Sequence, residues 1–505
     1  MKKTSLLTRK KVHFLWLLAC TFLMIGCADG YDSPNGFDLG VFNTKMETPI
    51  QDSISFKVST DGKTATVSWP TVAGADGHEV TFMNVDDPDN PFIVDGYDKK
   101  IVDGSKFTIS VTEDSKYEMT MRTLGNKKLN NTDADSPSTF HFTTLVPSVM
   151  TIPSGEEISS YIASHPIDSV GEEVAIDLEP NGVYTLADTV DFKHQKLTFR
   201  GDKIHRPIVN ITGNGHFETY SMLKVKFINF DMTEATAEGF IAMSKQAPES
   251  ILTQNLGKYY RGTSVINNIY MVEEPIYIAN CWFKNLPHAM IYDNQVQVAY
   301  WYFTVSDCIV QMNNTTKKNV GFINLYDAGR CIKNILIENS TIYNIVDNNS
   351  ACFIRYHISA SNSQPDKVFG NLTAEYNSQS WTFRNVTFSK TYTGWRFVNN
   401  TSPNSMTLIV DHCIFYDVCE LYRMNQGGRT YRFNFLWSPR ENDITRNKSM
   451  SDNGGTPFAS VYDPLFGGDV TKELDFSQPN GGVNFTPGEY QIVMEQSGDP
   501  RWYSN

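Results

Sequence analysis

A short β-rich phrase recurs through the second half of the sequence and limits the fold more than any other feature. Its copies read ANCWF (279–283), SDCIV (306–310), ENSTI (338–342), RNVTF (384–388) and DHCIF (411–415). One position of the phrase is polar in every copy and recurs at intervals of 27, 32, 46 and 27 residues: Asn280, Asp307, Asn339, Asn385 and His412. Asn229 is a candidate earlier member. A period in the twenties, or about twice that, predicts a solenoid of stacked β coils.

The positions after the polar residue predict how such a coil packs. The next position is mostly small, and the third is apolar in every copy, which is typical of an inward-facing ladder. Cys281, Cys308 and Cys413 share the small position, so we expect buried core residues there rather than disulfides. The sequence contains no CxxC motif, so a zinc site or a thioredoxin-like redox site is not indicated.

The polar position resembles the asparagine ladder of pectate-lyase-like right-handed parallel β-helices. In that family, Asn side chains stack at a bend between two strands of each coil. The resemblance implies coils separated by the ordinary strand spacing, about 4.8 Å. The expected fold is therefore all-β, with a parallel β-helix over 146–435.

The beginning of the chain is predicted to be an export signal. Five basic residues and an apolar run precede Met24-Ile25-Gly26-Cys27. This tetrapeptide resembles the lipobox of bacterial lipoproteins, which implies a signal peptide over 1–26 and a lipid on Cys27. A plain secretory signal is the alternative. Residues 27–50 are rich in Gly, Asp, Asn and Pro, which is typical of a tether.

Residues 51–145 are predicted to form a separate β module. Six short strand-like segments alternate with turn residues. Trp69 and Tyr117 resemble the core Trp and late-strand Tyr of fibronectin type III domains, which implies an immunoglobulin-like sandwich. Ser154 and Glu157 form a capping-box pattern that predicts a short helix over the start of the β-helix. Residues 436–505 lose the period and are interpreted as the end of the β-helix with a cap, in which Trp502 covers the last coil.

The charge excludes some partners. The net charge is −13, and removal of a signal with five basic and no acidic residues would lower it to −18. Nucleic acid and anionic membrane surfaces both favour basic proteins, so neither is an expected partner.

Candidate binding residues come from the strand that follows the ladder in each coil, which usually carries the groove in pectate-lyase-like helices. This rule selects strands at 290–294, 321–327, 352–357, 395–400 and 421–426. Alternation in the third of them predicts Phe353, Arg355 and His357 outside and Cys352, Ile354 and Tyr356 inside. The candidate site residues are Tyr292, Asp293, Asn324, Arg355, His357, Arg396, Asn399, Arg423 and Asn425.

These side chains favour binding over an identified reaction. Guanidinium groups suit carboxylates and amides suit hydroxyls, and uronic acid polysaccharides present both. A solvated polar face with internal salt bridges is the alternative interpretation. The selected strands contain no dense acidic cluster and no facing pair of carboxylates, so no catalytic residue, metal site or cofactor is assigned. Ca²⁺ is expected only if the protein is a lyase.

The whole arrangement resembles Bacteroidota surface lipoproteins that join a fibronectin type III-like module to a pectate-lyase-like β-helix of unassigned function. The resemblance implies a lipid anchor in the outer membrane, exposure at the cell surface, and partners in a glycan-uptake complex. We expect a protein that holds polysaccharide along the β-helix as part of glycan utilisation. A divergent polysaccharide lyase or glycoside hydrolase is the first alternative, and a structural or adhesive surface protein is the second.

Overall fold

The computed structural model describes residues 41–59, 62–167, 171–261, 264–313, 321–325, 329–347, 352–356, 365–370, 378–394, 396–399, 406–424 and 427–503. The signal segment and Cys27 lie outside these residues. The chain divides into two compact units, Met1–Leu145 and Val146–Asn505. No helix in the described part of the chain is long and apolar enough to cross a membrane.

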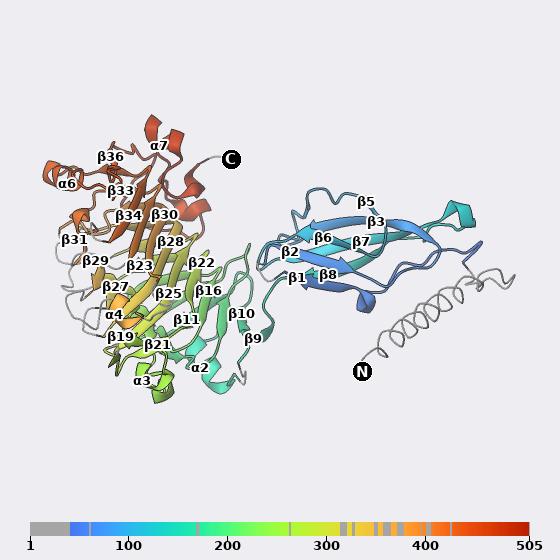
Figure 1. Ribbon diagram of the computed structural model, residues 1–505, viewed down its shortest axis with the longest axis horizontal. Coiled ribbons are helices and arrows are strands. Elements are labelled where there is room, and N and C mark those ends of the chain that lie inside the picture. Colours follow the sequence, from blue (N-terminus) through green and yellow to red (C-terminus); the bar gives the residue numbers. More distant parts are fainter. Residues whose placement is uncertain are drawn as a thin grey trace, which may run out of the picture. The chain divides into compact units, whose positions relative to one another are not determined.

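The first unit is a sandwich of two antiparallel sheets (Figure 1). One sheet has the order β1-β2-β6, with β1 at Ser55–Val58, β2 at Thr64–Ser68 and β6 at Lys106–Ser110. The other pairs β4-β3-β7-β8 and adds β5 beside β3, with bounds Ala75–Asn84 (β3), Phe92–Ile93 (β4), Lys100–Val102 (β5), Lys116–Gly125 (β7) and Ser138–Thr143 (β8). Trp69 and Tyr117 lie in the core that the two sheets share.

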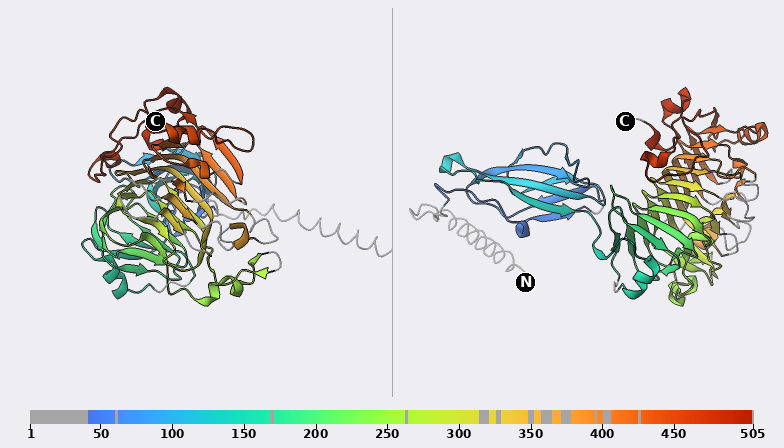
Figure 2. Two further views of the ribbon diagram at one scale, coloured as in Figure 1. Left: turned by 90° about the vertical axis from the view of Figure 1, so that its left-hand side faces the viewer. Right: turned by 180° about the vertical axis from the view of Figure 1, so that it is seen from behind.

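The second unit is a parallel β-helix (Figures 1 and 2). Each strand pairs in parallel with its counterpart in the next coil. One face is a sheet of seven strands, β12-β15-β18-β24-β27-β29-β31. Their bounds are Thr189–Asp191, His216–Thr219, Gly239–Met243, Ala289–Tyr292, Gly321–Leu325, Cys352–Tyr356 and Arg396–Val398.

The remaining parallel strands form the other two faces, which meet at the repeated polar position. Before the corner lie β9 (Ser148–Ile152), β10 (Val174–Leu178), β13 (Leu197–Arg200), β16 (Leu223–Lys226), β21 (Tyr270–Val272), β22 (Ile276–Ala279), β25 (Val298–Ser306), β32 (Thr407–Asp411) and β34 (Gly428–Arg432). After it lie β11 (Val183–Leu186), β14 (Ile208–Gly213), β17 (Asn229–Ala235), β23 (Trp282–Leu286), β26 (Ile309–Met312), β33 (Ile414–Tyr416), β35 (Phe435–Trp437) and β36 (Ser460–Val461). Two strands, β28 (Cys331–Asn344) and β30 (Ser380–Ser389), run through the corner.

The corner is a left-handed backbone position, which explains the repeated residue type. Asn280, Asp307, Asn339, Asn385 and His412 all have φ between 47° and 54°. Asn and Asp tolerate this conformation better than other residues with a side chain. Asn385 also donates from Nδ2 to Oδ1 of Asn339 at 3.2 Å, so neighbouring coils are joined through the ladder.

Asn229 is not an earlier member of the ladder, contrary to the sequence prediction. It pairs with Trp282, two residues beyond the corner, while Phe227 occupies the corner with φ 59°. Phe433 occupies it after His412, with φ 50°. The coil geometry therefore imposes the left-handed backbone. Phe227 and Phe433 adopt it in the coils on either side of the ladder, although Phe favours it less than Asn does.

The predicted core ladders are confirmed. Cys281, Cys308 and Cys413 are fully buried and form no disulfide, and Cys331, Cys352 and Cys419 are also buried. The apolar ladder continues through stacked rings, including Phe230 on Phe283 at 5.0 Å and Phe388 on Phe415 at 5.1 Å. Burial of these rows supplies the main stabilisation of the second unit.

Helix α2 (Ile158–Ser164) covers the first coils with the buried side chain of Ile158. Its N-cap is Glu157 rather than Ser154, because the carboxylate accepts from the backbone N–H groups of Ser159 and Ser160. Burial would raise the pKa of Glu157, but hydrogen bonds from Ala187, Ser159 and Ser160 outweigh it and lower the pKa to about 2. Ser154 instead accepts from the Val183 N–H.

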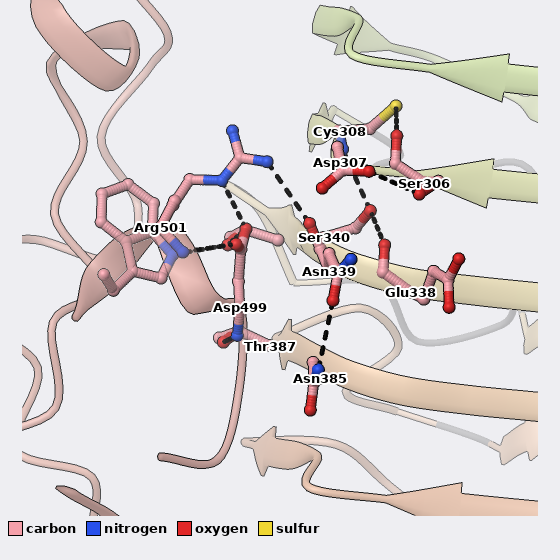
Figure 3. A network of polar contacts seen from close by, with 12 residues as sticks. Ser306, Asp307, Cys308, Glu338, Asn339, Ser340, Asn385, Thr387, Asp499 and Arg501 are labelled. Atoms are coloured by element: carbon pink, nitrogen blue, oxygen red, sulfur yellow. Dashed lines mark hydrogen bonds and ion pairs between the residues drawn. The ribbon is translucent and has the colours of Figure 1, made fainter. Parts of the chain in front are cut away.

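The C-terminal segment follows a different path from the one predicted. After α6 (Glu441–Asn447) and β36, it passes through α7 (Tyr490–Glu495) and η7 (Pro500–Trp502). Trp502 does not cover the last coil: its Nε1 donates to Thr341 of β28 at 2.7 Å, and its ring packs near Phe485. Asp499 accepts from Thr341 and pairs with Arg501, whose guanidinium reaches the Asn339 carbonyl oxygen (Figure 3). The segment thus clasps the corner of the central coils from outside.

The remaining short elements lie in loops. They are η1 (Gln51–Ser53), η2 (Lys127–Leu129), η3 (Glu249–Ile251), α3 (Thr253–Leu256), the β19–β20 hairpin (Tyr260–Arg261 and Ser264–Val265), α4 (Pro365–Val368), η5 (Leu421–Arg423) and η6 (Pro479–Gly482).

Candidate functional site

A row of side chains crosses the seven-stranded sheet in register. Each member is the Cα partner of the next across neighbouring strands, at the strand spacing of about 4.8 Å. The row consists of Asp191, Glu218, Ala242, Tyr292, Asn324 and Arg355. Polar side chains from five of these six strands are therefore arranged in a line, which Ala242 interrupts.

A cavity of about 700 Å³ opens over this row. Its acidic lining residues are Glu218, Glu238 and Asp293, and its basic ones are Lys245, Arg330 and Arg355. Asn214, Asn294 and Asn324 add amides, and Thr189 and Thr236 add hydroxyls. The lining is therefore suited to a polar ligand with several hydrogen-bonding groups.

Small residues make room for the cavity. Ala242 interrupts the row, and it packs with Ala289 against the ring of Tyr292. A Cβ on Gly239 would lie 2.4 Å from Cδ1 of Tyr292 and 3.1 Å from the Ala289 carbonyl oxygen. Only glycine at 239 allows the Tyr292 ring to lie in this place.

His216 and Glu218 form a hydrogen-bonded pair in the wall of the cavity. Nδ1 of His216 lies 2.7 Å from the Asn214 carbonyl oxygen, which can only accept, so we assign a proton to Nδ1. Nε2 lies 3.3 Å from Oε1 of Glu218, and Oε1 also accepts from Nδ2 of Asn294 at 2.7 Å. An imidazole nitrogen and a carboxylate oxygen therefore face each other within hydrogen-bond distance.

Asp293 and Arg330 form an ion pair at 3.3 Å in which both side chains are largely buried. Arg330 also donates from Nε to the Val296 carbonyl oxygen, and Asp293 accepts from the Gln295 N–H. These contacts hold the turn after β24 in place. Asp293 therefore supports the cavity wall, and its charge is balanced.

Asn324 and Arg355 form the far end of the row. Nη1 of Arg355 donates to Oδ1 of Asn324 at 3.3 Å. This contact fixes the amide so that its NH₂ group points away from the guanidinium. Both residues thus present hydrogen-bond donors to the cavity.

Two titratable groups in the row have raised pKa values. Burial, with smaller contributions from the negative charges of Glu218, Glu238 and Asp293, raises the pKa of Tyr292 well above its usual value. Burial also raises the pKa of Asp191, and hydrogen bonds from Ser244 and the Lys193 N–H oppose this shift only in part. The phenol of Tyr292 is therefore a donor at neutral pH.

The structure brings together four of the predicted site residues and separates the others. Tyr292, Asp293, Asn324 and Arg355 line the cavity. Among the remaining candidates, Arg396 pairs with Glu420 at 3.1 Å, Asn399 is buried, and Arg423 lies in the helical turn η5 rather than in a strand. His357 and Asn425 lie outside the described residues.

The predicted alternation in β29 is wrong at Phe353. Its ring is fully buried and stacks on Phe322 and Phe397, with centroids 4.7 Å apart in each case. The neighbouring Ile354 is buried in the same cluster. Two consecutive inward residues break the period of two, so only Arg355 of the predicted outward residues is seen to reach the cavity.

Sequence reasoning missed the acidic half of the site. His216, Glu218 and Glu238 come from earlier coils, where Phe227 rather than Asn holds the corner and the ladder could not be followed. The available signal was the strand HFET at 216–219, about one coil before Ala242. In the described residues no group of three or more His, Cys, Asp or Glu side chains is placed to hold a metal ion.

Comparisons with known proteins give domain matches without an activity. Residues 1–190 match DUF4992, a domain of unknown function, and residues 182–345 match DUF4957, also a domain of unknown function. No curated protein matches the chain.

Solved structures that are similar include three polysaccharide lyases. Pectate lyase Pel3 from Pectobacterium carotovorum has 9% identity, covers 60% of this chain and 87% of its own, and has a TM-score of 0.13. Pectate lyase PelI from Erwinia chrysanthemi, solved with tetragalacturonic acid, has 9% identity, 62% and 88% coverage and a TM-score of 0.13. A mutant of the PL6 family alginate lyase AlyGC has 11% identity, 70% and 59% coverage and a TM-score of 0.17. The parallel β-helix is assigned here from the strand pairing itself.

Proposed function

We propose that the second unit binds polysaccharide in the cavity over β15, β18, β24, β27 and β29. The observation that carries this proposal is the in-register row of polar side chains Glu218, Tyr292, Asn324 and Arg355, which lines the cavity along the parallel sheet. A linear polymer with hydroxyl and carboxylate groups matches such a line better than a compact small molecule does. Uronic acid-containing glycans remain the expected ligands.

We further propose that the protein is exported, lipid-anchored at Cys27 to the outer membrane, and exposed at the cell surface beside glycan-uptake proteins. The lipobox-like Met24-Ile25-Gly26-Cys27 supports the anchor. The first unit serves as a fibronectin type III-like spacer. Its division into sheets of β1-β2-β6 and β4-β3-β7-β8 supports this assignment, as does the bond from the Thr112 N–H to the buried Tyr117 hydroxyl at 2.7 Å.

The binding test uses the mature full-length protein and a panel of acidic and neutral oligosaccharides in titration calorimetry. We expect saturable binding of at least one glycan and a loss of about tenfold or more in affinity for Asn324→Ala, which removes a direct hydrogen bond. Lys448→Ala is the control, because Lys448 is an exposed basic residue at the end of α6. Absence of binding across the panel would exclude the proposal.

Glycan cleavage is the second candidate, and the His216–Glu218 pair favours it. An imidazole beside a carboxylate at a cavity wall is a pair of side chains that can transfer a proton to a leaving oxygen, which is the role of a general acid. The same incubations therefore include an assay for new reducing ends and for ultraviolet-absorbing unsaturated products. Cleavage that disappears in His216→Gln, with glycan binding retained, would select this candidate over binding alone.

A further inference from the structure

A second cavity, of about 410 Å³, lies at the corner of the β-helix. The ends of β30 and β32, the corner residues that follow them and the C-terminal segment after α7 enclose it. This corner cavity is lined by Arg384, Asn385, Asp411, His412, Glu495, Gln496, Pro500 and Tyr503. None of these residues belongs to the seven-stranded sheet, so the two cavities lie on different faces of the β-helix. The volume is in the range of small-molecule sites in proteins.

The corner cavity opens where the ladder of amides stops. Nδ2 of Asn385 donates back to Asn339 in the neighbouring coil at 3.2 Å (Figure 3). The next coil has His412 at the corner, and Nδ1 of this ring lies 2.8 Å from Oδ1 of Asp411 rather than beside the Asn385 amide. Oδ1 of Asn385 therefore has no hydrogen bond among the described residues, and it is available to a ligand.

Three more lining side chains have hydrogen-bonding groups that the protein leaves unused. Nε2 of His412 and the carboxylate of Glu495 have no partner in the part of the chain that the structure describes. Arg384 lies 3.5 Å from Glu338 and 3.9 Å from Asp411, but its guanidinium makes no hydrogen bond within the same residues. Acceptors and donors are therefore available side by side in one cavity.

The charges of the corner cavity do not suit an anion. Arg384 is the only Lys or Arg side chain among the described lining residues, and Glu338 and Asp411 already balance its charge. Asp411 is itself paired with Arg432 at 2.5 Å. Glu495 is left as a carboxylate without an ion pair among the described residues. A carboxylate or phosphate of a ligand would therefore meet a negative charge and no positive charge to offset it.

Hydroxyl groups suit the same lining. A hydroxyl can donate to Glu495 or to Oδ1 of Asn385, and it can accept from Arg384. Pro500 and Tyr503 add apolar surface against which the C–H face of a sugar ring can pack. The Tyr503 hydroxyl donates to the Ser497 carbonyl oxygen, which holds the ring in place. A neutral sugar therefore matches the cavity in both its hydrogen bonds and its charge.

We propose that the corner cavity is a second carbohydrate site, which binds a neutral, hydroxyl-rich mono- or disaccharide unit. The proposal does not rest on the binding function of the cavity over the seven-stranded sheet, because the two sites share no lining residue. The two sites also differ in the ligand expected, since the corner cavity should not accept a uronic acid.

The experiment titrates the mature full-length protein with four neutral disaccharides, namely cellobiose, lactose, mannobiose and xylobiose, in a calorimeter. Each titration is repeated in the presence of excess digalacturonate. At least one neutral disaccharide is expected to bind saturably, with the same affinity whether or not digalacturonate is present. Absence of binding by all four, or displacement of the bound disaccharide by digalacturonate, would overturn the inference.

Two variants of the corner cavity test the assignment. Glu495→Ala removes the unpaired acceptor, and we expect it to weaken binding of the neutral disaccharide about tenfold. His412→Asn should have an effect of similar size. Asn suits the φ of 52° at this corner, and its amide can bond to Asn385 and so occupy the acceptor. Glu441→Ala and His194→Asn, at exposed positions, are the matched controls and should change nothing.

Asn324→Ala separates the two sites, because it alters the cavity over the sheet and should leave binding of the neutral disaccharide unchanged. Loss of that binding in Asn324→Ala, with wild-type affinity in Glu495→Ala, would overturn the inference and leave the function of the other cavity standing. Thermal unfolding shows whether each variant is folded, and Glu495→Ala carries the test if His412→Asn is not. A folded Glu495→Ala protein with the full wild-type affinity would also overturn the inference.

Discussion

Thr341 joins the C-terminal clasp to the β-helix, and its replacement by Val tests how much the clasp contributes to stability. The hydroxyl of this fully buried residue donates to Oδ2 of Asp499 at 2.8 Å and accepts from Nε1 of Trp502 at 2.7 Å. Val keeps the branched shape and suits a strand. The substitution therefore removes two hydrogen bonds and little else.

The expected cost follows from what the two partners lose. Asp499 is 1% exposed and Trp502 is 5% exposed, so water cannot replace the missing hydroxyl. Trp502 is left without its acceptor, which costs about 1–3 kcal/mol. Asp499 keeps its ion pair with Arg501 but loses a hydrogen bond to a charged group, which contributes about 1.5–3 kcal/mol. We therefore expect Thr341→Val to lower the free energy of opening the clasp by about 3–5 kcal/mol.

The assay is hydrogen exchange measured by mass spectrometry on peptides from 497–503 and from β28, because a chain with two units does not unfold in one step. The control is Thr430→Val, whose side chain is exposed on β34. That substitution should change stability by less than about 0.5 kcal/mol. If the C-terminal peptide is equally protected from exchange in Thr341→Val and in wild type, the Thr341 contacts do not stabilise the clasp.

Three further predictions concern the cap, the corner and the groove. Glu157→Gln should lower the stability of the second unit by about 1 kcal/mol near neutral pH. The carboxylate has a folded-state pKa of about 2 against 4.5, so its contribution is complete above pH 4.5 and is lost as the pH falls toward 2. Urea titrations across this range check the trend, and a difference between wild type and variant that stays constant down to pH 2 would contradict it. Phe433→Asn should raise stability by about 1 kcal/mol in urea, because φ at Phe433 is 50° and Asn tolerates that backbone better. Phe92→Asn, at an exposed position of ordinary φ, is its control, and an equal gain in both would contradict the argument. Gly239→Ala should displace the Tyr292 ring, destabilise by about 1–3 kcal/mol and weaken glycan binding, whereas Gly428→Ala, with open space around its Cβ position, should do neither. Titration calorimetry on both variants measures the glycan affinity, and an unchanged affinity in Gly239→Ala would contradict the proposed role of the cavity.

The ladder of corners was predictable because one backbone conformation selects one kind of residue. Asn280, Asp307, Asn339 and Asn385 all have left-handed backbone, and few residues other than Gly adopt it easily. The same reasoning failed at Phe227, where packing overrides local preference. Because the corner residue at 227 was not recognised, the earlier coils could not be aligned. The acidic residues that line the cavity from those coils were therefore not predicted.

Side-chain direction in the groove strands was less predictable than the existence of the strands. The prediction assumed that successive side chains along a strand alternate strictly between the two sides of a flat sheet. The strands of this face are short and end at turns, where the alternation breaks down. Cys352 and Ile354 are buried and Arg355 lines the cavity, as predicted, whereas Phe353 is buried against the prediction. The structure was therefore needed to show which residues face outward, whereas the residue types in the sequence already indicated the chemistry.

The extent of the groove is limited at both ends by side chains that are already paired with other residues of the protein. Beyond Arg355, the next coil places Arg396 against Glu420, and the same Arg396 donates to the Asn399 carbonyl oxygen. These groups hold β31 against η5 and offer a ligand little charge that is not matched internally. Toward the other end, Asp191 is partly occupied by Ser244. The residues that line the cavity lie between these limits.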